Sequence, residues 1–271
     1  MKTKIKTLSL LIGVFQMAAY PLSSEAAISC GAGPCVAIDG ATAQSKTPLR
    51  IVPKKPNMWN PSAPLIAQID SKPGGKTYGH WAAQWAQWAI GSPAATNPIF
   101  DPDGQYCALR QVDDVWFLAG ANSSDPVVRQ CSIPAGKSLF FPLINNYYGA
   151  WLNDLPEETR TEEFVRAKAS CSLPATISAS IDGRKVLRPT QYFTGASGSE
   201  SPIFNVQLPP GNIWSDDVSV IPELLNHPSA EQGYYLFIKP LPIGTHTIQW
   251  TASGCSPGQK QNVTYHITVE N

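Results

Sequence analysis

The apolar positions of this chain recur with two different periods, which distinguish a helical segment from a series of strands. Between Tyr78 and Ile90 the large apolar side chains lie about one helical turn apart, and Gly91-Ser92-Pro93 ends the run. At about 100° per residue, one face of this segment collects Tyr78, Trp81, Ala82, Trp85, Trp88 and Ala89. The pattern predicts a helix over 78–90 that packs its indoles against a sheet. The alternative is an aromatic wall that stacks on sugar rings.

Most other apolar segments are short or alternate with polar residues, which predicts strands. These segments are 115–119, 138–144, 176–181, 184–187, 233–238, 245–251 and 262–270. Pro142 indicates an edge or a bulge inside its strand. Asp182-Gly183 is a strong signal for a two-residue type I′ hairpin. A second helix fits 156–171, with capping-box patterns that begin at Asp154 and Thr159.

Together these elements predict a mainly β fold. We expect an antiparallel β-sandwich, Ig-like or jelly-roll-like, with a Trp-rich helix and a second short helix packed on it. Residues 27–76 are rich in Pro, Ser and Gly and show no sustained period, so they are interpreted as an N-terminal arm. The expected organisation is a signal peptide over 1–26, the arm over 27–76 and a single β-sandwich domain over 77–271.

The first residues have the pattern of a secretory signal peptide. Lys2, Lys4 and Lys6 precede an apolar run over 8–20, and Ser24-Glu25-Ala26 places small residues at −3 and −1 of a cleavage site. An exported protein meets oxidising conditions, where its six cysteines are expected to pair. Proximity on the predicted map favours Cys107–Cys131 and Cys171–Cys255. The remaining two, Cys30 and Cys35, can close a small loop, with the alternative that each pairs elsewhere.

Composition excludes several classes of partner. Lys and Arg number 20 against 20 Asp and Glu, charged residues make up only 15%, and no basic stripe is present. This balance predicts no nucleic-acid binding. No second apolar run is long enough to span a bilayer, so we expect no transmembrane segment after signal removal. The oligomeric state is left open.

The histidines do not predict a metal site. No His-x-x-x-His or His-Glu-x-x-His spacing occurs among His80, His227, His246 and His266. Strand parity places His246 with Ile248 on an apolar face, whereas His266 lies opposite the apolar residues of its own strand. The two side chains are therefore expected on opposite faces, one inward and one outward. We expect no metal and no cofactor.

The most unusual polar segment is 145–151, which directly follows an apolar strand. Amides next to aromatic rings suit a sugar or peptide site, because hydroxyls need planar donors and acceptors while C–H faces pack on rings. The alternative is a loop whose Tyr and Trp pack on the core. The predicted ligand-binding set adds two polar residues of the 78–90 helix and consists of Asn145, Asn146, Tyr147, Tyr148, Trp151, His80 and Gln84.

Carboxylates supply the only candidates for catalysis, and no catalytic residue is identified among them. Glu157, Glu158, Glu162 and Glu163 lie on the second predicted helix, where a solvated face is the simpler interpretation. Asp113-Asp114 and Asp216-Asp217 precede strands, where Asp usually forms turns. A glycosidase needs two carboxyls several ångströms apart across a cleft.

Several segments in order resemble a family of secreted bacterial proteins without an established activity. They are Tyr78-Gly79-His80-Trp81 with Trp85 and Trp88, Val115–Gly120, Phe140–Asn145, and Pro240–Ile248. The resemblance implies a bacterial signal peptide and a β-rich extracytoplasmic domain, secreted or periplasmic. The function expected from all these patterns is an extracytoplasmic protein that binds carbohydrate or another cell-envelope component. The alternatives are a secreted polysaccharide hydrolase or lyase with Asp/Glu acid–base residues, and a structural envelope protein.

Overall fold

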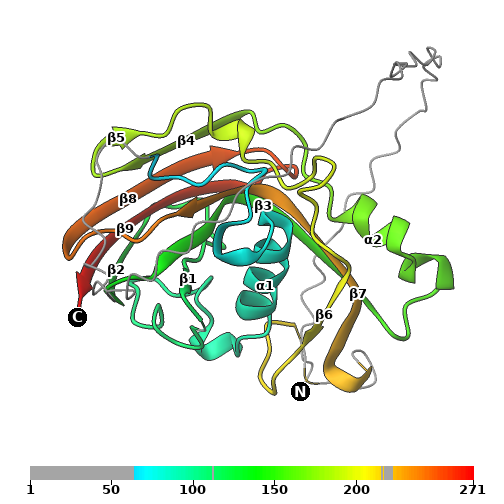
Figure 1. The fold of residues 1–271 in the computed structure, drawn as a ribbon. Helices are drawn as coiled ribbons and strands as arrows, with labels where there is room; N and C mark the ends of the chain where they lie inside the picture. The colour runs from blue at the N-terminus through cyan, green and yellow to red at the C-terminus, as the bar shows by residue number, and fades with distance from the viewer. Residues whose placement is uncertain (1–63, 112, 215, 217–221) are drawn as a thin grey trace, which may run out of the picture. The chain divides into compact units, whose positions relative to one another are not determined.

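The computed structural model describes residues 64–111, 113–214, 216 and 222–271, and within them the chain forms two β-sheets (Figure 1). Sheet A has the order β1 (Val115–Phe117), β3 (Ser138–Trp151), β7 (Leu225–Ile238), β6 (Phe204–Gln207). Sheet B has the order β2 (Val127–Pro134), β9 (Lys260–Glu270), β8 (Gly244–Ser253), β4 (Thr176–Ile181), β5 (Arg184–Lys185). The predicted mainly β sandwich with helices is confirmed. Most neighbouring strands are antiparallel, while β1–β3 and β2–β9 are parallel pairs.

Sheet A lies between sheet B and the Trp-rich helix. The rings of Phe141 and Trp250 join the two sheets, with centroids 4.9 Å apart. On the other face of sheet A, Trp85 of α1 (Tyr78–Ile90) meets Tyr235 edge-to-face at 6.1 Å. Strand alternation puts Phe141 and Tyr235 on opposite faces of the sheet, so one face packs against sheet B and the other against α1.

The helix α1 has the predicted bounds and the predicted core role. Trp81, Trp85 and Trp88 are 3%, 3% and 5% exposed. Each indole N–H donates to a backbone carbonyl, and that of Trp85 reaches Leu118 O at 2.9 Å. Because each of these indole N–H groups has an acceptor, burial of the three rings leaves none of their donors unpaired. Packing of the indoles against the sheet is confirmed.

The second helix begins later than the sequence pattern predicts. Residues Glu157–Arg160 form a short 3₁₀ turn, and α2 covers Glu162–Lys168. The side chain of Thr161 accepts a hydrogen bond from Phe164 N at 3.2 Å, so Thr161 is the N-cap. The predicted start at Asp154 or Thr159 is therefore wrong. Further 3₁₀ turns of the described chain are Pro73–Gly75, Ala94–Thr96, Pro189–Gln191 and Pro222–Leu224.

Strand β3 is twice as long as predicted, because residues 145–151 continue it. The interpretation of 145–151 as a loop is wrong, since antiparallel pairing with β7 runs from Leu139 opposite Ile238 to Trp151 opposite Asn226. Pro142 lies in a central strand, where a register shift between Pro142 and Ile144 forms the predicted bulge. Strands β2 and β6 were not predicted.

Local turn and cysteine predictions agree with the structure. Asp182 and Gly183 both have positive φ, 50° and 73°, as the type I′ hairpin requires. Disulfides join Cys107 to Cys131 and Cys171 to Cys255. Cys30, Cys35 and the predicted signal peptide lie outside the described residues.

Of the predicted arm, Ile66 forms a β-bridge with Ile238. In the part of the chain that the structure describes, no helix has the length and apolarity to cross a membrane.

Candidate functional site

The alternation of strand β3 separates the predicted ligand-binding residues. Asn145 and Tyr147 share the face of sheet A that α1 covers, where Asn145 Nδ2 donates to Glu231 Oε1 at 2.9 Å. Asn146 and Tyr148 project from the opposite face. Asn146 Nδ2 donates to the carbonyls at the end of α2, and Tyr148 meets Phe164 edge-to-face at 5.9 Å. These four residues therefore do not line one site.

The other three predicted residues have separate neighbours. Trp151 packs edge-to-face on Trp214 with centroids 5.2 Å apart. His80 Nδ1 lies 2.8 Å from Thr77 Oγ1, and Gln84 Oε1 accepts from a lysine, Lys76, at 3.0 Å. The structure does not bring the predicted set together into a common groove.

A buried acid in sheet A was not predicted from the sequence. Glu231 is 2% exposed and lies opposite Tyr147 in the register. Its Oε1 accepts from Asn145 and from Tyr235 OH at 2.6 Å, whereas Oε2 has no partner. Burial, only partly offset by these hydrogen bonds, raises the pKa of Glu231 to about 8, and burial also raises the pKa of Tyr235. The raised pKa means that Glu231 is an uncharged acid at neutral pH.

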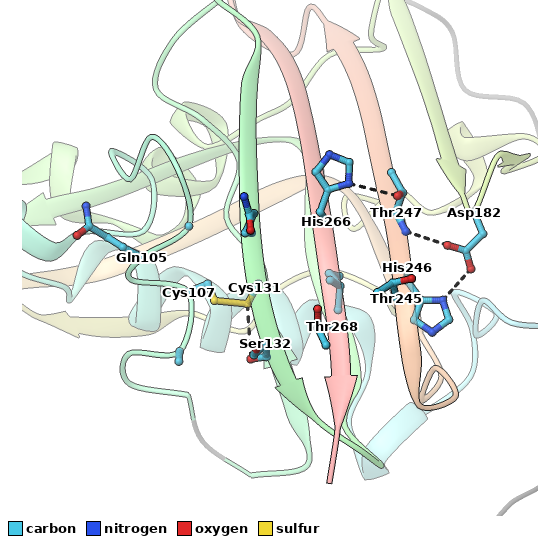
Figure 2. Close-up of a pocket in the computed structure, with 14 residues that line it drawn as sticks. Gln105, Cys107, Cys131, Ser132, Asp182, Thr245, His246, Thr247, His266 and Thr268 are labelled. Atoms are coloured by element: carbon cyan, nitrogen blue, oxygen red, sulfur yellow. Dashed lines mark hydrogen bonds and ion pairs between the residues drawn. A yellow bond between two sulfur atoms is a disulfide. The ribbon is translucent and has the colours of Figure 1, made fainter.

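A hollow of about 620 Å³ lies on the outer face of sheet B, and we call it the groove (Figure 2). Alternation along β8 and β9 turns Ile248 and Ile267 inward and their polar neighbours outward. The strand register then places polar side chains in two rows across β2, β9 and β8. One row is Gln130, His266 and Thr247, and the other is Ser132, Thr268 and Thr245. Neighbouring members of a row are about 5 Å apart, the spacing of strands in a sheet.

One wall of the groove is the loop 104–108, which is fixed to β2. The Cys107–Cys131 disulfide joins the two segments, and Gln130 N donates to Asp103 O at 2.8 Å. Gly104, with φ 97°, approaches so closely that a Cβ there would lie 2.1 Å from Gln130 O. The buried carboxylate of Asp101 accepts the backbone N–H groups of Gly104 and Tyr106 at 2.9 and 2.8 Å. These contacts keep the wall in place without a ligand.

Behind that wall is a buried cation. Arg129 is 1% exposed and points inward from β2. Its guanidinium donates to the carbonyls of Asp101, Ala119 and Gly120 and to the hydroxyl of Tyr265. The guanidinium thereby ties three separate segments together at the back of the groove.

The opposite wall is the Asp182 turn. Asp182 Oδ2 lies 2.8 Å from His246 Nδ1, and Oδ1 accepts Thr247 N at 2.8 Å (Figure 2). The other ring nitrogen of His246, Nε2, lies 2.9 Å from Pro242 O. The His246 side chain is only 9% exposed, while His266 is exposed on the outer face. The predicted inward and outward placement of the two histidines is confirmed. Among the described residues, no group of three or more His, Cys, Asp or Glu side chains could hold a metal ion.

The groove was missed because its residues form no binding or catalytic motif. The only trace of the groove in the sequence is the polar residues at the outward-facing positions of two strands. They are Thr245-x-Thr247 in β8 and Thr264-x-His266-x-Thr268 in β9. Such polar positions usually form a solvated face, and only the register shows that they stand in rows beside two walls.

Comparison with known proteins yields little. No protein-family model and no curated protein matches the chain. Among solved structures, the cysteine protease inhibitor EhICP2 from Entamoeba histolytica is 12% identical, with a TM-score of 0.21, and the match covers 58% of this chain and 96% of that one. The solution structure of Amebosin is 7% identical, with a TM-score of 0.20, over 57% of this chain and 96% of that one. At these scores neither similarity supports an argument about fold or function.

Proposed function

We propose that this protein is an exported binding protein for carbohydrate and that the groove on sheet B holds the ligand. The observation that supports the proposal is the lining, two rows of hydroxyl, amide and imidazole groups across three strands. Sugars present hydroxyls that both donate and accept hydrogen bonds, and Thr, Ser and Gln side chains do the same. The two walls and the paired strands keep these groups in place, which lowers the entropic cost of binding.

The leader sequence and the disulfides support the extracytoplasmic setting. The signal-peptide pattern over 1–26 directs export, and the Cys107–Cys131 and Cys171–Cys255 bonds suit an oxidising compartment. A ligand in that setting is a glycan of the cell envelope or of the surrounding medium.

The experiment compares two identical substitutions on one strand. Thr245 and Thr251 are both exposed on the outer face of β8, but only Thr245 lines the groove. Threonine→valine keeps the branched shape and removes the hydroxyl, so Thr245→Val is expected to weaken glycan binding several-fold while Thr251→Val leaves it unchanged. A glycan array identifies the ligand, and titration calorimetry measures both variants. The proposal fails if the wild type binds no glycan, or if both variants lose affinity equally.

A further inference from the structure

We propose that Asp182 determines the specificity of the groove, and that its carboxylate recognises adjacent hydroxyls of an uncharged sugar. This inference rests on the proposed function, because it names the ligand class of the same groove. Asp182 lies in the turn between β4 and β5 and forms a wall of the groove (Figure 2).

The carboxylate of Asp182 is held in place and still has acceptor capacity. An ionised carboxylate has about four lone-pair sites. Two are used, by His246 Nδ1 and by Thr247 N, both at 2.8 Å. The side chain remains 43% exposed, so the unused sites can accept from a ligand. Two carboxylate oxygens match two neighbouring hydroxyls, and such charge-assisted hydrogen bonds are shorter and stronger than neutral ones.

His246 acts as the positioning residue behind Asp182. Both ring nitrogens face acceptors, the carboxylate of Asp182 and the carbonyl of Pro242. Because the His246 side chain is almost buried, the ring cannot turn toward a ligand. Its effect on the ligand is therefore through the orientation of Asp182.

The charges around the groove favour an uncharged ligand. Among the described residues that line the groove, none is Lys or Arg. The titratable ones are Asp182 and His266, whose side chains are exposed, and His246, whose almost buried side chain lies behind Asp182. A uronic acid would place its carboxylate near Asp182, with the imidazole of His246 already engaged. Like charges at short range repel, so acidic sugars are expected to bind more weakly than neutral ones.

The main alternative is that Asp182 only stabilises its turn. Asp182→Asn separates the two roles, because Asn also tolerates positive φ and keeps an oxygen for Thr247 N. The variant loses the charge and half of the acceptor capacity. We expect affinity for neutral glycans to fall about tenfold, the loss typical of one charge-assisted hydrogen bond. The preference for neutral over acidic glycans should shrink with it, while the melting temperature changes little.

The test uses two panels of probes and one control variant. Cello-, malto- and manno-oligosaccharides are compared with oligogalacturonate and oligomannuronate, against wild type, Asp182→Asn and Glu270→Gln. Glu270 is an exposed carboxylate on β9 that does not line the groove, so its removal should leave the ratio of neutral to acidic affinities unchanged. This ratio is measured on folded molecules and does not depend on the folded fraction, so partial unfolding of the Asp182 variant cannot imitate the result.

The outcomes distinguish the two proposals. If the wild type binds neither panel, the carbohydrate function fails. If the wild type binds glycans but accepts acidic ones equally well, or if Asp182→Asn leaves the ratio unchanged, the function survives and the role of Asp182 is refuted. A reduced ratio in Asp182→Asn alone supports the specificity role.

Discussion

The buried acid Glu231 makes a quantitative prediction about stability and pH. Substitution of Glu231 by Gln keeps the size of the side chain and an oxygen that can accept from Asn145 and Tyr235. The amide nitrogen takes the place of Oε2, which has no partner in the structure. The variant therefore resembles the protonated acid and cannot ionise.

The sign and magnitude follow from the two pKa values. The pKa of Glu231 rises from 4.5 to about 8 on folding, so between these values the folded state retains a proton that the unfolded state has lost. The stability contribution of Glu231 is complete below about pH 4.5 and disappears as pH rises to about 8. By pH 7 about 2.5 pH units of this range have been crossed, which corresponds to about 3 kcal/mol at about 1.4 kcal/mol per unit.

Chemical denaturation at several pH values measures this effect. At pH 4 the wild type and Glu231→Gln are expected to have similar free energies of unfolding. At pH 7 the variant should be more stable by about 3 kcal/mol, or about 6–12 °C in melting temperature for a chain of this size. Glu163→Gln changes an exposed carboxyl of α2 and serves as the control, with no comparable difference between the two pH values.

The difference between variant and wild type isolates one group from all others that titrate. If Glu231→Gln is less stable than the wild type at pH 7, then Glu231 is ionised in the folded protein and has a partner that offsets its burial. A difference that does not change between pH 4 and pH 7 would also refute the argument, because it would mean that no proton is linked to folding through this group.

Two further predictions concern the core and the cysteines. Trp85→Ala is expected to lower the free energy of unfolding by about 3–5 kcal/mol, because the indole is 3% exposed and its N–H donates to Leu118 O. A loss below about 1 kcal/mol, measured by urea titration, would contradict that packing. Thiol alkylation of the protein purified without reductant should leave Cys107, Cys131, Cys171 and Cys255 unlabelled. Mass spectrometry that detects stoichiometric labelling at any of them would overturn the assigned bonds.

Features determined by neighbouring residues could be predicted from the sequence. The helix over 78–90 follows from the spacing of its tryptophans and from the glycine and proline after it. The Asp182-Gly183 hairpin follows from the conformations that these two residue types tolerate. The inward placement of His246 needed only the parity of one strand.

Features determined by the pairing of segments that are distant in the sequence could not be predicted. The segment 145–151 is extended because β7, more than 70 residues later, pairs with it, and its own amides and aromatics indicated a loop. The uncharged state of Glu231 depends on burial in sheet A beside Asn145, which lies 86 residues away in the sequence. The groove depends on the register of β2 against β9, which no local pattern determines.

The parallel pairing of β2 with β9 has a consequence for how the protein is made. Gln130 pairs with His266 and Ser132 with Thr268, so the floor of the groove joins segments that are synthesised far apart in time. A chain that has emerged only as far as β8 lacks β9, the strand between β2 and β8. Such contacts between distant segments form late and slowly. Binding of a ligand in the groove would then appear only after the sheet is complete, and a labelled ligand would report the last step of folding.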